Sequence, residues 1–193
     1  MAPIATTTDT SQRILDIAER LVQTRGFNGF SYADIAEAMN VTKASLHYHF
    51  RGKADLGKRL IERYEQNFLA ALAKIDAQTD DAGEKLRRYA AIYGSVLKDD
   101  RMCLCGMLAA EFGTLPDAMR VEMRHFFDVN ESWLAGVLKQ GKREKKLKFT
   151  GPAEDTAQAL VGSLEGAMMI ARSYADPKRF KMVSERVLAE LGA

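Results

Sequence analysis

The chain has 193 residues, a formal net charge of +2 and two cysteines. This length allows one large or two small folded units, and two cysteines are too few for a fold held together by disulfide bonds. The small net charge argues against general polyanion binding, so a nucleic-acid site would have to be local. No stretch approaches the ~20 apolar residues of a membrane-spanning helix, and residues 1–10 lack a secretory signal pattern. We therefore expect a cytoplasmic protein.

Apolar residues recur at spacings of three and four along most of the chain, which predicts an all-α fold. The first helix is expected over residues 11–25, ended by Gly26. A long helix is expected from Ala54 to Ala77, because no proline interrupts its pattern. Further helices are predicted at residues 84–98, 102–112, 117–142, 153–174 and 177–191. The segment 102–112 is apolar, sulfur-rich and without a polar face, so we expect it to be buried in the centre of a second domain.

The segment Ser31–Leu56 predicts two short helices joined by a tight turn. The first has an apolar stripe formed by Tyr32, Ile35, Ala36 and Met39. Ser31 is a suitable N-cap for it, and Asn40 tolerates the left-handed conformation that often ends a helix. Thr42 is a suitable N-cap for the second helix, which should end near His49.

Val41, Leu46 and Phe50 are expected to be buried, which leaves a set of small, hydroxyl, cationic and aromatic side chains facing outward. This set consists of Thr42, Lys43, Ala44, Ser45, His47 and Tyr48. Residues 42–63 contain six Lys or Arg and two Asp or Glu, whereas residues 1–41 contain three and five. An ordinary three-helix packing unit would explain the apolar spacing but not this distribution of charge. The pattern favours a helix-turn-helix that binds DNA.

The same segment resembles the DNA-binding domain of TetR-family transcriptional regulators, whose signature reads T-x-x-x-I-A-x-x-A-G-V-S-x-G-T-L-Y-x-H/Y-F-x-x-K-x-x-L. The direct matches are Ile35, Ala36, Val41, Leu46, Phe50, Lys53 and Leu56. The departures are Met39, Asn40, Ala44 and His47, and they bear on the preferred DNA sequence. The resemblance implies base contacts by Thr42, Lys43, Ala44, Ser45 and His47. It implies phosphate contacts by Ser31, Tyr48 and Lys53.

The resemblance also implies two domains. Residues 1–56 would form a three-helix DNA-binding domain with the start of a connecting helix, and residues 57–193 a helical domain for effector binding and dimerisation. The last two helices would form a four-helix bundle with their copies in a homodimer, and Gly162 and Gly166 would let another helix approach closely. The implied function is a ligand-responsive repressor that binds a palindromic double-stranded DNA operator and is released by a small molecule.

Flexible methionines beside flat aromatic side chains suit an adaptable apolar pocket, so we expect an apolar or aromatic effector. Most such residues must be ordinary core, and only a minority should touch a ligand. The candidates are Tyr93, Met102, Cys103, Met107, Phe112, Phe126, Trp133 and Met168. Glu111, His125, Asn130 and Arg172 are the polar groups that could orient it.

Cys103 supports a more specific hypothesis. The run from Cys103 to Glu111 resembles the C-L-x-G-N-L-x-x-E segment of TetR-type repressors that sense electrophiles or oxidants through the first cysteine. Such sensing requires an accessible thiolate, which Arg101 could favour. A cysteine in an apolar run is more often buried and inert, and we favour that interpretation.

Enzyme, metal and cofactor functions have no positive support in the sequence. The pairs His47 with His49 and Cys103 with Cys105 diverge by about 200° on a helix, so neither forms a chelating pair. There is no phosphate-binding glycine loop, and we expect neither a metal nor a cofactor. Two alternatives without a DNA role stay open, a helical interaction scaffold and a thiol-dependent redox protein.

Overall fold

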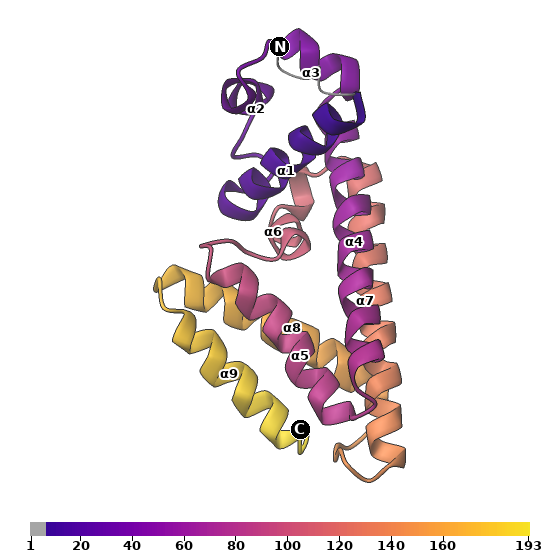
Figure 1. Cartoon of the computed structure of the whole chain (residues 1–193). Helices are drawn as coiled ribbons and strands as arrows, with labels where there is room; N and C mark the ends of the chain where they lie inside the picture. Colours follow the sequence, from indigo (N-terminus) through magenta and orange to yellow (C-terminus); the bar gives the residue numbers. More distant parts are fainter. Residues whose placement is uncertain (1–6) are drawn as a thin grey trace. The chain divides into compact units, whose positions relative to one another are not determined.

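A computed structural model describes residues 7–193, and within this range the chain forms helices and no strands (Figure 1). In chain order these are α1 (Thr7–Arg25), α2 (Tyr32–Met39), α3 (Lys43–His49), α4 (Lys53–Gln78), α5 (Ala82–Leu97), α6 (Leu104–Ala110), the short 3₁₀ helix η1 (Phe112–Thr114), α7 (Asp117–Arg143), α8 (Ala153–Ser173) and α9 (Pro177–Glu190). The predicted all-α fold is confirmed. Residues 1–6, which belong to the segment expected to lack a secretory signal, lie outside the described residues.

The chain divides into two compact units. Among the described residues, the head unit consists of residues 7–64 together with Leu104–Met123, and the bundle unit consists of Glu65–Cys103 and Arg124–Ala193. The long helices α4 and α7 each contribute residues to both units.

This division differs from the sequence-based boundary at residue 56, because the chain returns to the head unit with α6, η1 and the start of α7. We expected residues 102–112 at the centre of the second domain, whereas α6 packs against α1. Its final residues, Ala109 and Ala110, are exposed. Gly57 of α4 lies so close to Met119 of α7 that an added Cβ would be 2.4 Å from the Met119 sulfur. These long-range contacts could not be read from local periodicity.

In the bundle unit, α8 and α9 are adjacent antiparallel helices, and α5 packs against both (Figure 1). Pro177 begins α9, where its missing N–H costs no hydrogen bond, and the Asp176 carboxylate accepts a hydrogen bond from the Lys178 N–H at 3.0 Å. The buried faces of α8 and α5 consist of residues spaced by three and four, as the sequence predicts.

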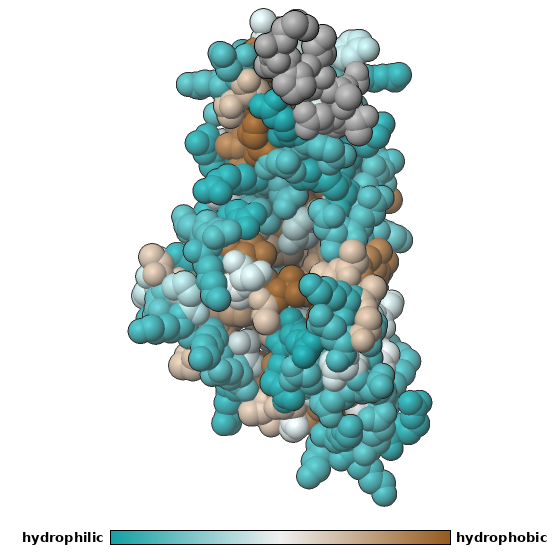
Figure 2. Space-filling view, viewed as in Figure 1, coloured by the Kyte–Doolittle hydropathy of each residue, from teal (hydrophilic) through white to brown (hydrophobic). Residues whose placement is uncertain are grey.

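Figure 2 shows that hydrophilic side chains cover most of the visible face, with hydrophobic side chains in small separate patches. Among the described residues, no helix combines the length and apolar character needed to cross a membrane.

Candidate DNA-reading and effector sites

Helix α2 is fixed at both ends by the residues that the sequence indicates. The Ser31 Oγ accepts a hydrogen bond from the Ala33 N–H at 3.2 Å, and the Asp34 carboxylate accepts one from the Ser31 N–H at 2.7 Å. The hydrogen bonds from Ser31 lower the pKa of Asp34. Asn40 ends the helix in the left-handed conformation, with φ of 55°. The turn into α3 is therefore specified locally.

Helix α3 presents the side chains expected at a DNA-reading surface. Thr42 caps it and accepts a hydrogen bond from the Ser45 N–H at 3.3 Å. Leu46 is buried, whereas the side chains of Lys43, Ala44 and His47 are exposed. Tyr48 is 80% exposed, which is unusual for a large aromatic residue, and its ring meets that of His49 edge to face at 5.3 Å.

His47 lies against the ring of Tyr32, with centroids 4.9 Å apart. The Tyr32 hydroxyl donates to the Phe50 carbonyl at 3.3 Å, and burial raises the pKa of Tyr32 to about 12. Tyr32 therefore remains a neutral phenol that holds α2 against the end of α3. The imidazole of His47 thus contacts Tyr32 while the residue as a whole stays exposed.

The prediction for Val41 is wrong. We expected a buried residue between the two helices, but its side chain is 37% exposed. The Val41 N–H donates to the Ala36 carbonyl at 3.0 Å as part of the helix end. The turn thus directs this side chain outward.

Lys53, which the sequence predicts to bind phosphate, makes several contacts with the loop between α1 and α2. Its ammonium group donates hydrogen bonds to the carbonyls of Phe27 and Phe30 and lies 4.6 and 4.3 Å from their ring centroids. Desolvation lowers the pKa of Lys53, with the carboxylates of Glu111 and Asp34 acting in the opposite direction. The amine thus holds the α1–α2 loop with two of its three N–H donors. Its contact with phosphate stays a prediction.

Glu111, which follows α6, binds the same loop from another side. Its carboxylate accepts hydrogen bonds from the Phe27 N–H at 2.5 Å and the Asn28 N–H at 3.2 Å. The Asn28 amide donates to the Thr114 hydroxyl at 2.7 Å. Gly26, at φ of 82°, leaves room for the carboxylate, since an added Cβ would lie 2.7 Å from its Oε1. The sequence suggested Glu111 as a possible effector contact, but the structure uses it to order the segment before α2.

The comparisons with known proteins agree with this geometry. Residues 14–60 match the N-terminal domain of "Bacterial regulatory proteins, tetR family", and residues 82–187 match the "Tetracyclin repressor-like, C-terminal domain". The chain belongs to the TetR family. TetR-family proteins are DNA-binding, ligand-responsive transcriptional regulators and not enzymes, and they usually act as dimers.

A solved TetR-family regulator from Agrobacterium tumefaciens is 32% identical to this chain, with a TM-score of 0.93 over 96% of this chain and 99% of that one. The transcriptional regulator AcuR of Cereibacter sphaeroides is 28% identical over 77% of this chain and 69% of its own length. The transcriptional repressor DhaR of a Mycobacterium species is 25% identical over 84% of this chain and 82% of its own length.

The effector candidates of this TetR-family chain fall into both units. Phe126 lies edge to face with Phe68 at a centroid distance of 5.1 Å, and Trp133 stacks on Tyr89 at 5.7 Å. Met102, Cys103 and Met168 are buried in the same unit. Met107 and Phe112 belong instead to the head unit, where the Arg120 guanidinium lies 5.0 Å from the Phe112 ring.

A closed set of hydrogen bonds lies at the centre of the bundle unit. The Tyr89 hydroxyl donates to the Asn130 Oδ1 at 2.7 Å, the Asn130 amide donates to the Tyr93 hydroxyl at 3.0 Å, and the two hydroxyls are 3.0 Å apart. Burial raises the pKa of both tyrosines well above the ordinary value. The three side chains are fully buried and satisfy one another, which fixes the register of α5 against α7.

Glu165 of α8 is a buried acid that the sequence analysis missed. Both of its carboxylate oxygens are inaccessible to solvent and neither has a hydrogen-bond partner of good geometry in the described chain. Burial raises the pKa of Glu165 to about 7, and the neighbouring Cys103 thiol acts weakly in the opposite direction. The signal was available, since Glu165 occupies the apolar stripe of α8 four residues after Val161 and three before Met168.

Proposed function

We propose that the chain is a homodimeric repressor that binds a palindromic operator through α3 and releases it when a small apolar or aromatic molecule binds in the bundle unit. The observation that carries this proposal is the outward face of α3, where the side chains of Lys43, His47 and Tyr48 are exposed. One short helix covers few base pairs, so two-fold symmetry with half-sites about one helical turn (~34 Å) apart supplies the missing contacts.

The surface of α8 and α9 supports the dimer. Met169, Ile170 and Tyr174 at the end of α8 and Met182 of α9 are between 52% and 63% exposed. An added Cβ on Gly162 of the same helix would meet no atom within 4 Å. Exposed apolar side chains beside small residues suit a close helix partner, and a second copy of the same two helices provides one.

Release by an effector would follow from a population shift. A ligand that binds one arrangement of the bundle unit more tightly than another shifts the equilibrium toward it. Since α4 and α7 are continuous through both units, such a shift would alter the separation of the two α3 helices. The DNA contacts would be unchanged, but their spacing would no longer match adjacent major grooves.

Selection of bound sequences from a random DNA pool tests the DNA-binding proposal. We expect a palindrome whose half-sites lie about one turn apart, with its recovery lost for Lys43→Ala and kept for Lys145→Ala, an exposed lysine of the α7–α8 loop. Binding should weaken at higher salt because phosphate contacts release counterions. Weak, sequence-independent retention that Lys43→Ala leaves unchanged would contradict the proposal.

Sedimentation equilibrium tests the dimer. We expect Gly162→Trp to shift the protein toward the monomer by blocking the α8 surface. The matched control is Gly136→Trp on α7, where an added Cβ likewise meets no atom within 4 Å. A dimer that withstands Gly162→Trp but dissociates with Gly136→Trp would place the interface elsewhere.

A further inference from the structure

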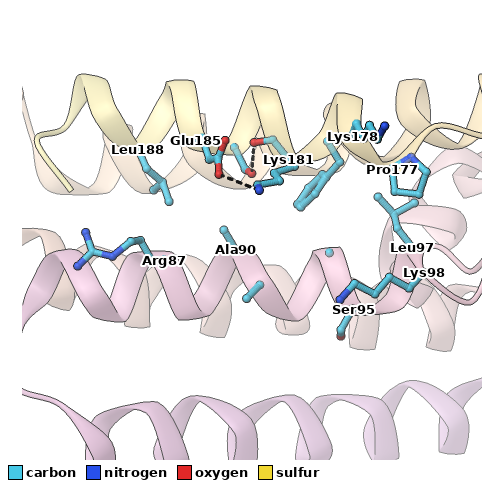
Figure 3. A pocket seen from close by; sticks show the side chains of 14 residues that line it. Arg87, Ala90, Ser95, Leu97, Lys98, Pro177, Lys178, Lys181, Glu185 and Leu188 are labelled. Carbon is cyan, nitrogen blue, oxygen red and sulfur yellow. Dashed lines mark hydrogen bonds and ion pairs between the residues drawn. The ribbon is translucent and has the colours of Figure 1, made fainter.

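A groove between α5 and α9 is separate from the aromatic candidates for the effector site (Figure 3). Its volume is about 440 Å³, within the usual range for small-molecule pockets. All the residues that line it belong to the bundle unit.

The floor of the groove is apolar. Ala90 and Leu97 of α5 and Phe180 and Leu188 of α9 contribute buried side chains to it. Gly94 brings the α5 backbone close to the Phe180 ring, since an added Cβ would lie 3.3 Å from it. A continuous apolar strip between two helices suits an unbranched hydrocarbon chain better than a polar ligand.

The charged residues around the groove are unbalanced. Four cationic side chains, Arg87, Lys98, Lys178 and Lys181, line it with one carboxylate, Glu185. Glu185 pairs with Lys181 at 3.7 Å, and Arg87 pairs with Glu84 at 3.0 Å. Within residues 7–193, neither Lys98 nor Lys178 has an ion-pair partner.

These two lysines lie at the same end of the groove. Figure 3 places Lys98, Lys178 and Pro177 at one end and Arg87 with Leu188 at the other. Lys98, the C-cap of α5, follows Arg87 by eleven positions, which corresponds to a length of ~16 Å at 1.5 Å per residue. The groove is thus elongated, apolar along its length and cationic at one end.

We propose that the α5–α9 groove is a second ligand site, which binds an unbranched carboxylate of medium chain length. The hydrocarbon chain lies along Ala90, Gly94 and Phe180, and the carboxylate lies at the end of the groove that Lys98 and Lys178 line. The complementarity is twofold, because the apolar strip accepts the chain and the two uncompensated cations accept the head group. The site does not depend on the identity of the effector in the aromatic region.

Isothermal titration calorimetry with dodecanoate, below its micelle concentration, tests the proposal with the full-length protein. Two probes separate its parts: dodecyltrimethylammonium keeps the chain and reverses the head-group charge, and butyrate keeps the carboxylate and shortens the chain. We expect dodecanoate to bind at least ~10-fold more tightly than either probe. Equal binding of the two twelve-carbon probes would overturn the role of the lysines.

Variants locate the site. Lys98→Glu combined with Lys178→Glu should weaken dodecanoate binding roughly tenfold or more, and Ala91→Trp, an exposed groove residue, should abolish it by filling the space. Lys145→Glu reverses a charge outside the groove and should change nothing, and thermal unfolding confirms that each variant is folded. Full dodecanoate binding by the folded groove variants would overturn the proposal. The proposal would also be overturned if the groove variants changed the oligomeric state but not dodecanoate binding, because the groove would then contact a second copy of the chain.

Discussion

The Glu111 carboxylate accepts a hydrogen bond from the backbone N–H of Phe27, a residue 84 positions earlier in the chain. With the Asn28 N–H and the nearby ammonium of Lys53, it surrounds the loop that precedes α2 with fixed polar contacts. The orientation of the DNA-reading helices therefore depends on a residue from the middle of the sequence.

Glu111→Ala should lower the free energy of unfolding by about 2 kcal/mol, because two backbone donors lose a charged acceptor. Operator affinity should fall as well, since the loop before α2 loses its order. Thermal unfolding and DNA-binding titrations measure the two effects. Thr114→Val, which removes a neutral hydrogen bond to Asn28, is the milder control. An unchanged unfolding temperature for Glu111→Ala would contradict the importance of these contacts.

Asn130→Leu should destabilise the protein by about 2 kcal/mol, since the tyrosine hydroxyls of Tyr89 and Tyr93 lose a buried partner. Denaturant unfolding measures this loss. Ser132→Ala, two residues further along α7 at an exposed position, should have an effect within experimental error. A stable Asn130→Leu protein would mean that the two hydroxyls satisfy each other.

Glu165 makes stability fall as pH rises. In the unfolded chain the carboxyl group loses its proton near the ordinary pKa of 4.5, whereas the folded protein keeps it up to about 7. The free energy of unfolding therefore falls by about 3 kcal/mol as the pH rises from 4.5 to about 7, and it falls no further above this range. Relative to wild type, the free energy of unfolding of Glu165→Gln should rise by the same amount across this pH range. Denaturant unfolding at several pH values measures it.

The control for this comparison is Glu190→Gln, an exposed residue at the end of α9. It should show the same pH dependence as the wild type. If Glu165→Gln also follows the wild-type curve, the acid is ionised in the folded protein and must have a partner.

The two thiols should react slowly with N-ethylmaleimide in the native protein and rapidly after unfolding. Cys103 and Cys105 are 2% and 0% exposed, so the reagent cannot reach either thiol in the folded protein. Mass spectrometry of Cys103→Ser and Cys105→Ser separates the two sites. Rapid native modification of Cys103 together with release of DNA would instead support thiol-based sensing.

Local chemistry made much of the head predictable. Ser31, Asn40 and Thr42 act within one turn of their own positions, so their roles as caps follow from the sequence and are confirmed. Val41 was placed wrongly because the turn geometry directs its side chain outward. The contacts of Lys53 with the distant carbonyls of Phe27 and Phe30 could not be predicted from the sequence.

In the bundle unit, too, the local sequence predicts the helices but not the contacts between them. Its helices follow from apolar periodicity, but the meeting of Tyr89, Asn130 and Glu165 with Cys103 depends on the packing of several helices. Likewise, the α5–α9 groove arises from the absence of a side chain at Gly94 and from lysines on separate helices. The position of Glu165 in the apolar stripe of α8 indicates burial, but the partners in neither arrangement can be predicted from the order of residues.

The discontinuous head unit has a practical consequence for protein engineering. A chimeric regulator that joins only residues up to Tyr64 to a foreign ligand-binding domain would omit α6, Glu111 and Thr114. Its DNA-reading module would lack the acceptor for the loop before α2 and the residues that cover Gly57. A transplant that includes Leu104–Met123 keeps the module whole, so the exchangeable part consists of two separate stretches of the gene.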